Sequence, residues 1–576
     1  MRSLTKRAAP EAQIAVIAIF VVAAVACLPM LWYGASNGHS IVYNLVWLKN
    51  FSAQLAHGDL YPRWLMDMNH GAGSPVFYFY APLPFYVISI PTLILHGSKL
   101  TVQLAWGEWL LIAFSGVAFF RYARRRYTPL IAMFGAVLYM LLPYHFEIDL
   151  WRRQDIGELA NYIWMPLILY YVEKLFDGRR AIVGLAICYA LMLLSHLPSA
   201  LLFSIGVGGY VLVLLWSRFS WWHLARFAGG IAIGLLLAGI YWVPALFSEQ
   251  YVRSEKLWTP YFDFHKWFFP INEAPHHDAG AHAFADRLFM MIGVSTAIFA
   301  LCWLPAFRWR ETVGTKKLVG CLALIGIAWF LMSSWSTFVW ENVPELWKVQ
   351  FPWRIAMVVD FAAAIAALHA LHCLQVHRDW FSATALVVAL VLLTWCFATA
   401  DVKNKLDPFD NAWWVTGRDN AVRNGLDAPE YTTAWNRSKS ADTSTEIADQ
   451  QRLAYESNAG EIKITHWLPR KIVLQVNLQQ ATSLRVHQFY FPNWRARTED
   501  GTLLQVAPSH KNGLLVVELP AGNYRVDLQL VSLPQELIGA GLSVSGVALL
   551  FGCVSWRDRR RNPRPSIVDT DAASVS

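Results

Sequence analysis

Long hydrophobic runs dominate this chain, and short polar segments separate them. A helix needs about 20 mostly apolar residues to cross a bilayer, because its backbone amides must be satisfied within the helix. The runs predict twelve transmembrane helices, over residues 12–33, 102–120, 128–144, 158–175, 181–195, 198–216, 227–246, 288–306, 318–334, 355–375, 381–399 and 535–555. Prolines at 82, 84 and 91 interrupt a further apolar segment, 77–96, which we predict to lie at or dip into the membrane interface.

The pattern changes to strict alternation near residue 450. Ile472, Leu474, Val476 and Leu478 alternate with polar residues, and this period of two is typical of half-buried strands. We therefore predict an antiparallel β-sandwich in front of the last span. The organisation that follows is a transmembrane domain (1–399) with a long first external loop (34–101), a periplasmic domain (400–534) that is β-rich from about 450, a last helix (535–556) and a cytoplasmic tail (557–576).

Composition and charge place the chain in the membrane and set its orientation. Hydrophobic residues make up 56% of the chain and charged residues 15%, which excludes a disordered or nucleic-acid-binding protein despite 48 Lys and Arg against 40 Asp and Glu. With twelve spans, most basic loop residues, including the Arg124–Arg126 run, fall on the side of both termini. The positive-inside rule makes that side cytoplasmic. If 77–96 were a thirteenth span, the Arg124–Arg126 run would face outward.

The first external loop carries polar chemistry on the outer side. Its Gly58–Trp64 run and the Gly71–Pro75 element mix glycines with aromatic rings, and Asp59, Arg63 and Asp67 supply charge. Arg63 and Trp64 could bind a phosphate and a sugar at the lipid headgroup level, whereas Asp59 or Asp67 could accept a proton. The alternative is an interfacial aromatic belt, which explains the rings but not the glycines.

A second polar segment, Arg152–Glu158, lies between two predicted spans. Arg152 and Arg153 could neutralise a phosphate, and Asp155 or Glu158 could take a proton from an attacking hydroxyl. Ionisable groups at this depth usually face a cavity or each other, so internal Arg–acid pairing is the alternative.

Three smaller segments also present polar groups on the outer side. Trp353 and Arg354 follow Pro352 at a membrane entry, and His196 lies in a tight turn. We consider these substrate-binding candidates, with anchoring or packing as the alternative. No metal site is predicted with certainty. The weak candidates are His276, His277, Asp278 and His282, of which Asp278 and His282 would share one face of a helix, and a divalent metal is a possible cofactor.

Several of these segments, in order over residues 35–360, resemble a known family. They include Gly58–Trp64, Gly71–Pro75, Arg153 with Glu158, Ser195–Pro198 and Gln350–Arg354. The chain resembles the bacterial membrane proteins named for a "6-pyruvoyl-tetrahydropterin synthase-related domain", and its architecture is similar to that of C-type (GT-C) glycosyltransferases. In the family pattern the first loop begins His-Asp and has a second His. Here Ser40 follows His39 and Asn44 stands at the second His, so the usual acidic base is missing.

The resemblance implies a membrane glycosyltransferase of the bacterial inner membrane, with both termini cytoplasmic. It would move a sugar from a polyprenyl-phosphate donor to a glycan, lipid or protein acceptor at the periplasmic face, with membrane lipids as further partners. Asp67 and Asp155 rank ahead of Glu158 and Asp59 as the proton acceptor. The alternative is a non-catalytic transport or assembly protein for lipid-linked glycans.

Overall fold

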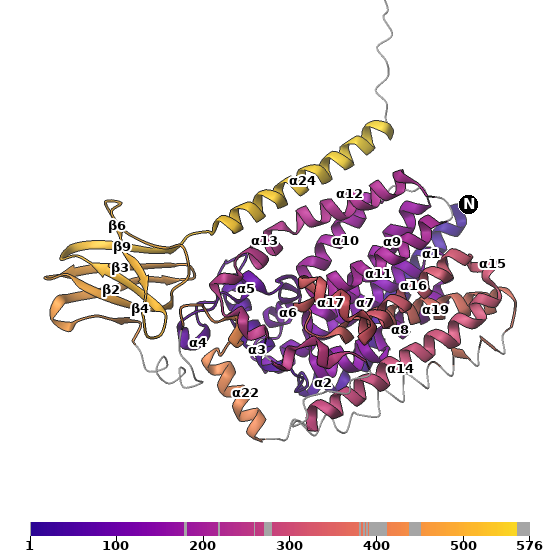
Figure 1. The fold of residues 1–576 in the computed structure, drawn as a ribbon, viewed down its shortest axis with the longest axis horizontal. Coiled ribbons are helices and arrows are strands. Elements are labelled where there is room, and N and C mark those ends of the chain that lie inside the picture. Colours follow the sequence, from indigo (N-terminus) through magenta and orange to yellow (C-terminus); the bar gives the residue numbers. More distant parts are fainter. Residues whose placement is uncertain are drawn as a thin grey trace, which may run out of the picture.

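A computed structural model shows a helical bundle with a β-domain attached at one end (Figure 1). It describes residues 2–177, 181–216, 219–258, 260–269, 279–379, 412–436 and 451–561, together with a few positions between 382 and 390. The β-domain and the N terminus lie at opposite ends of the bundle (Figure 1).

The first half of the bundle alternates long helices with short ones. The bounds are α1 (Arg2–Ala26), α2 (Leu28–Tyr33), α3 (Ile41–Ala56), α4 (Met68–Gly71), α5 (Val76–Phe79), α6 (Leu83–Ile94), α7 (Leu100–Ala123), α8 (Pro129–Leu141), the π-helix η1 (Tyr144–Arg153), α9 (Ile156–Phe176), α10 (Ile182–Ser195) and α11 (Leu197–Trp216). The segment 77–96, predicted to be interfacial, contains the end of α5 and the 12-residue helix α6. At about 1.5 Å per residue α6 is too short to cross a bilayer alone.

The second half continues the bundle and ends in one long peripheral helix. Its helices are α12 (Trp221–Leu237), α13 (Gly239–Phe247), α14 (Ala279–Arg308), α15 (Arg310–Val313), α16 (Thr315–Met332), α17 (Thr337–Asn342), α18 (Pro344–Trp347), α19 (Ala356–Val376), α22 (Ala412–Asn424) and α24 (Pro534–Arg561). Short 3-10 turns, among them η7 (Pro352–Ile355), join several of them.

Within the described residues, seven helices are long and apolar enough to cross a membrane, or eight if a bent pair counts as one span. The twelve predicted spans are therefore not confirmed. The apolar parts of α1 and α10 are shorter than a full crossing, and α9 carries Glu158, Glu173 and Lys174 along an otherwise apolar helix. Most of the predicted span 381–399 lies outside the described residues.

The bent pair is α12 and α13, which meet at an angle of 72°. A break leaves backbone groups without helical partners, and such groups are costly in a membrane. Ser543 of α24 satisfies two of them, because its Oγ donates to the Leu237 carbonyl (2.9 Å) and accepts from the Ile240 amide (2.8 Å). Gly539 lies so close to the Gly239 carbonyl that a Cβ would stand 2.5 Å from its oxygen. α24 is thus fitted to the break in its neighbour (Figure 1).

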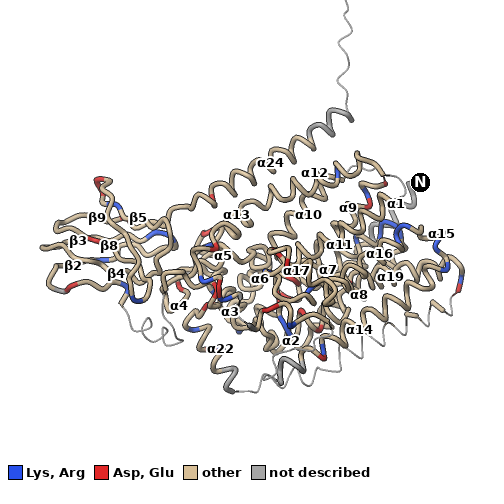
Figure 2. Tube along the Cα trace, in the orientation of Figure 1, with Lys and Arg blue, Asp and Glu red and all other residues tan. Residues whose placement is uncertain are grey.

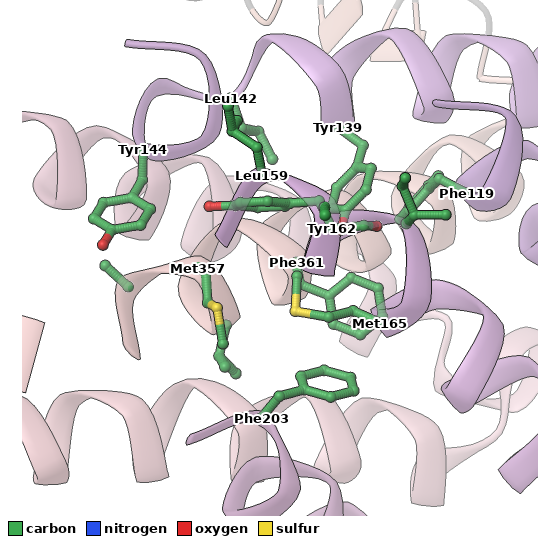
Figure 3. Close-up of a cluster of buried hydrophobic side chains, with 14 of the residues drawn as sticks. Phe119, Tyr139, Leu142, Tyr144, Leu159, Tyr162, Met165, Phe203, Met357 and Phe361 are labelled. Atoms are coloured by element: carbon green, nitrogen blue, oxygen red, sulfur yellow. The ribbon is translucent and has the colours of Figure 1, made fainter. Parts of the chain in front are cut away.

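The bundle packs around α19. In the most apolar 18-residue stretch of this helix and its entry turn, 94% of the residues are buried, whereas in the corresponding stretch of α24 only 11% are. Phe361 of α19 lies edge-on to Phe119 and near Tyr139, and these rings form part of the buried cluster in Figure 3. Tyr144 lies at one edge of this cluster, and the Tyr162 hydroxyl points toward that edge (Figure 3). The hydrophobic core therefore borders directly on polar groups.

The C-terminal domain contains two antiparallel sheets. One has the order β1-β4-β8-β7, from Leu453–Ala454, Thr482–Phe489, Leu514–Leu519 and Val506–Pro508. The other has the order β2-β3-β9-β5-β6, from Gly460–Leu468, Lys471–Leu478, Gly522–Leu530, Trp494–Thr498 and Leu503–Leu504. Alternate residues of both sheets, such as Val476 and Val517, enter one buried cluster. The predicted β-rich region is therefore present from about residue 450.

The first loop completes the core of this β-domain. Trp64 is fully buried against Phe491 and Trp494, and its Nε1 donates to Gln488 Oε1 (2.8 Å). Gly73 has a positive φ of 86°, and a Cβ there would lie 2.6 Å from the Trp64 ring. The glycine of the Gly71–Pro75 element is therefore required by close packing and by its backbone conformation.

Charged residues concentrate at the two ends of the bundle (Figure 2). At the end near α15 and the N terminus, Arg125 and Arg126 pair with Glu173 and Asp177. The hydroxyl of Tyr210 also donates to Glu173 Oε1 (3.0 Å). The Arg124–Arg126 run thus lies at the end opposite the β-domain, which agrees with the predicted separation of the two sides.

Candidate functional site

An irregular segment between α8 and α9 builds the candidate site. Residues Tyr144–Arg153 form a π-helix. Such helices are rare in proteins, and those that occur are often found at functional sites. Gln154 then adopts the left-handed conformation with a φ of 52°. Asp155 caps α9, because its Oδ1 accepts from the Glu158 amide (3.0 Å). These local features turn Arg153, Asp155 and Glu158 toward one another.

Arg153 is the centre of a buried ion-pair network, which we call the Arg153 hub (Arg153, Asp149, Asp155, Glu158 and Tyr144). Its guanidinium donates to Asp149, to Asp155 Oδ2 (2.5 Å), to Glu158 Oε2 (2.8 Å) and to the Tyr144 hydroxyl (3.2 Å). Glu158 Oε1 accepts a further bond from Tyr144 (3.1 Å). The internal pairing considered for this segment is therefore present.

Arg354 approaches the same hub from the start of α19. Its guanidinium lies 3.9 Å from Asp155 Oδ2, and the neighbouring Trp353 ring lies under Arg153 at 5.0 Å. The structure thus brings Arg153, Trp353 and Arg354 together, although about 200 residues separate them along the chain. Two guanidiniums beside one another form a site suited to a phosphate.

His196 lies beside the two carboxylates of the hub. The C-cap position after α10 holds it, and its Nδ1 is 2.6 Å from Ser199 Oγ. A Cβ at Gly157 would lie 2.9 Å from the imidazole, so a glycine is needed there. Burial lowers the pKa of His196 to about 4, against an opposing effect of Asp155. The imidazole is therefore less basic than that of an exposed histidine.

Asp155 stays ionised in this environment. Burial by itself raises its pKa, but the neighbouring His196, Arg153 and Arg354 and the amide of Glu158 outweigh burial and hold the pKa below the usual range of an aspartate. A carboxylate of this kind is suited to orient a hydroxyl or hold a cation.

Several buried polar atoms around the hub have no hydrogen-bond partner within the described residues. They are the side-chain amide of Gln154, Nε1 of Trp353, Nε of Arg354 and Oδ1 of Asn161. Buried polar groups are nearly always paired with protein, water or ligand. Water or a polar ligand can satisfy such atoms, so their concentration around one ion-pair network makes the hub the candidate site.

Two residues of the first loop, Ser40 and Asn44, lie against this hub. The Ser40 amide donates to the Arg153 carbonyl (3.0 Å), and Asn44 Nδ2 donates to the Gln154 carbonyl (2.7 Å). His39 also contacts the segment through its amide, which donates to the Arg152 carbonyl (2.9 Å). The backbone at position 40 therefore lies beside the segment that carries Asp155 and Glu158. Arg152 itself pairs with Glu147 (3.0 Å), at the edge of the hub.

Four other predicted site residues lie away from the hub, in the loop that meets the β-domain. Arg63 pairs with Glu536 of α24 (2.6 Å) and donates to the Ile240 carbonyl (2.7 Å). Trp64 belongs to the β-domain core, as described above. Asp59 accepts from Gln54 Nε2 (3.1 Å) within a turn, and Asp67 is exposed.

Sequence reasoning missed two acidic residues. Asp149 of the hub precedes Arg153 by four residues, a spacing that could have identified the pair on a helix. Asp427 follows α22 in a polar stretch without any motif, so no local signal marks it. Its carboxylate accepts from Trp47 Nε1 (2.9 Å), the Ala428 amide (2.8 Å) and Ser74. It joins the first loop to the segment that leads into the β-domain.

Asp427 predicts a specific pH dependence. Burial raises its pKa to about 6, although hydrogen bonds from Ser74 and Trp47 oppose the shift. Because the folded pKa lies above the unfolded value of about 3.9, its contribution to stability is fully present below that value and is lost as the pH rises through 6. We expect Asp427→Asn to melt progressively higher than wild type as the pH rises from 5 to 7.5, measured by thermal unfolding in detergent. A difference in melting temperature that is constant over this range would contradict the assignment.

The weak metal candidates His276, His277 and Asp278 lie outside the described residues. His282 lies within α14, in a part of that helix whose side chains are not described. A different group, Asp155, Glu158 and His196, does bring three ligand-type side chains together.

Comparison with known proteins identifies the family. A family model described as "Bacterial membrane protein YfhO" matches residues 70–413, which is more than half of the chain. The chain belongs to the YfhO family of bacterial membrane proteins. The match includes Arg153, Asp155, Glu158, His196 and Arg354 of the candidate site. The description of this family model does not mention the 6-pyruvoyl-tetrahydropterin synthase-related domain of the resemblance noted above. No curated protein matches this YfhO-family chain.

Proposed function

We propose that this protein is a GT-C-like glycosyltransferase that moves a sugar from a polyprenyl-phosphate donor to a glycan, lipid or protein acceptor. The observation that carries the proposal is the Arg153 hub with Arg354, His196 and the unpartnered polar atoms around them. Cations for a departing phosphate and carboxylates for an acceptor hydroxyl occur there together. The helices around the hub suit a lipid-linked substrate, because its polyprenyl chain can remain in the bilayer.

The transfer is a displacement at the anomeric carbon of the sugar. The oxygen of the acceptor hydroxyl forms a bond to that carbon, and the bond from the carbon to the phosphate oxygen breaks. The phosphate leaves with the bonding electron pair, which Arg153 and Arg354 stabilise as negative charge develops. The proton of the hydroxyl passes to a carboxylate. Preformed guanidiniums need no reorganisation when this charge appears.

The geometry supports Asp155 and Glu158 as the carboxylates of this step. Both lie in the hub with the guanidiniums, whereas Asp59 and Asp67 lie in the loop toward the β-domain. Asp155, whose pKa is low, is suited to orient the hydroxyl. The first loop places Ser40 beside the same hub, so these two carboxylates take the place of the missing loop acid.

The proposed location is the inner membrane, with both termini in the cytoplasm and residues 400–534 in the periplasm. The Arg125 and Arg126 ion pairs with Glu173 and Asp177, at the end near α15 and opposite the β-domain, support this orientation. The hub would then face the periplasm.

An assay in sealed vesicles tests the proposal. The purified protein would be reconstituted in known orientation with a panel of radiolabelled polyprenyl-phosphate hexoses, and transfer to added glycans and lipids measured. We expect transfer on the β-domain side only, with a loss of about 10²–10⁴-fold in Asp155→Asn or Glu158→Gln. Asp59→Asn and Asp67→Asn are matched controls that should stay near the wild-type rate. Equal losses in the controls, or transfer on the opposite side, would contradict the site or the orientation.

One observation favours a second candidate, a non-catalytic transport or assembly protein for lipid-linked glycans. Broken helices are common at the substrate sites of transporters, and α12 and α13 form such a break. Movement of a fluorescent lipid-linked glycan between leaflets by a wild-type protein that transfers no sugar would support this candidate over the enzyme.

A further inference from the structure

Three buried side chains of different chemistry converge at the start of α9. The carboxylates of Asp155 and Glu158 and the imidazole of His196 each present one donor atom, and these three atoms lie within 4.8 Å of one another. All three residues are at least nine-tenths buried. Ligand atoms bound about 2.0–2.2 Å from a common ion lie a few ångströms apart, so the spacing is close to that of a metal site.

The hydrogen bonds of His196 leave one ring nitrogen available. Nδ1 contacts Ser199 Oγ at 2.6 Å, while Nε2 has no hydrogen-bond partner among the described residues. If Nδ1 carries the proton and donates it to Ser199, the lone pair of Nε2 is free to bind a metal ion. A hydrogen bond that fixes the other nitrogen is the usual support of a metal-binding histidine.

The carboxylates around the three ligand atoms outnumber the guanidiniums beside them. Asp149, Asp155 and Glu158 are three carboxylates, and Arg153 and Arg354 are the two guanidiniums beside them. Neighbouring Glu147 has its own partners in Arg152 and Arg287. The hydrogen bonds from Arg153 and Tyr144 do not use all acceptor sites of these carboxylates, because an ionised carboxylate offers about four lone-pair sites. A cation can therefore bind without displacing Arg153.

We propose that Asp155, Glu158 and His196 bind a divalent cation of the Mn²⁺ or Zn²⁺ type. Two carboxylate oxygens with one imidazole nitrogen suit such ions, and the remaining coordination positions stay open for water or phosphate oxygens. Binding of the ion does not depend on whether the protein is a glycosyltransferase. Its role in holding the departing phosphate rests on the proposed function.

Titration of the full-length protein with Mn²⁺ in detergent tests this inference. Free Mn²⁺ is measured by electron paramagnetic resonance, without any sugar donor. We expect one saturable site per chain, with affinity lowered at least tenfold in Asp155→Asn and in His196→Ala. Ser199→Ala, which removes only the support of the imidazole, should lower affinity about tenfold. His277→Ala is the matched control and should bind as wild type does.

Folding and function are separated within the same experiment. Gel filtration and thermal unfolding show whether each variant is folded. If His196→Ala does not fold, Ser199→Ala still tests the role of the imidazole. Absence of binding by wild type at millimolar Mn²⁺, unchanged affinity in both Asp155→Asn and Ser199→Ala, or loss of binding in His277→Ala would overturn the proposal. Mn²⁺ binding without sugar transfer would support the metal site and contradict the proposed glycosyltransferase function.

Discussion

Replacement of Arg153 by Ala is expected to abolish binding of polyprenyl phosphate and to destabilise the protein. Arg153 donates to Asp155 at 2.5 Å and to Glu158 at 2.8 Å, and also to Asp149. The Ala variant would leave these buried carboxylates without their main cation. Loss of one partner from a buried ion pair costs about 3–5 kcal/mol. The measurement is thermal unfolding together with binding of labelled polyprenyl phosphate.

Arg354→Ala separates the ligand effect from the folding effect. Arg354 lies 3.9 Å from Asp155, too far for a direct hydrogen bond, so its loss should leave the fold intact. A charge-assisted contact with phosphate is worth about 1.5–3 kcal/mol, which corresponds to a roughly 10- to 150-fold weaker affinity. Lys348→Ala, which removes a half-exposed lysine paired with Glu249, is the control. Unchanged affinity in a folded Arg354→Ala and in Arg153→Lys would make both arginines structural only.

Replacement of Glu536 by Gln is expected to have the second large effect, on the attachment of the β-domain. Glu536 accepts from Arg63 at 2.6 Å, from Arg470 at 3.0 Å and from the Leu533 amide at 2.7 Å. These contacts join the first loop, the β-domain and α24. Gln keeps the shape of Glu but removes the charge, and it leaves two largely buried guanidiniums without a counterion. We expect a loss of about 3–5 kcal/mol.

Limited proteolysis and thermal unfolding measure this effect. The Glu536→Gln variant should melt lower and release the β-domain to protease faster than wild type. Glu518→Gln is the matched control, since Glu518 lies exposed on β8 and its carboxylate accepts, among the described residues, only from Ser483. Equal melting of the two variants would show that Glu536 does not hold the domains together.

Hydrophobic and polar periodicity determined much of the architecture. Apolar runs long enough to cross a bilayer predicted most long helices of the bundle, and alternation in 472–478 predicted strand β3. These patterns can be read locally, because whether a position is hydrophobic or polar depends on whether its face of the helix or strand is buried or exposed. The number of spans was less well determined, since α9 and α10 owe their place to packing against neighbours as well as to hydropathy.

The candidate site was determined only in part. Arg153, Asp155, Glu158 and Arg354 could be named because charged residues at span ends are expensive and need a reason. The sequence could not place His196 beside Asp155, nor show that the Gly71–Pro75 element packs Gly73 on Trp64. It also suggested Arg63 as a ligand for phosphate, where the structure pairs Arg63 with Glu536.

The sequence by itself thus determined the membrane class of the chain, the period of its elements and the chemical types available at its polar segments. The tertiary structure alone decided which of those groups meet. Arg63 and Glu536 are 473 residues apart, and Ser74 and Asp427 are 353 apart. Their contacts follow from how helices and the β-domain pack, which depends on the shapes of whole surfaces. No local pattern of hydrophobic and polar positions records those shapes.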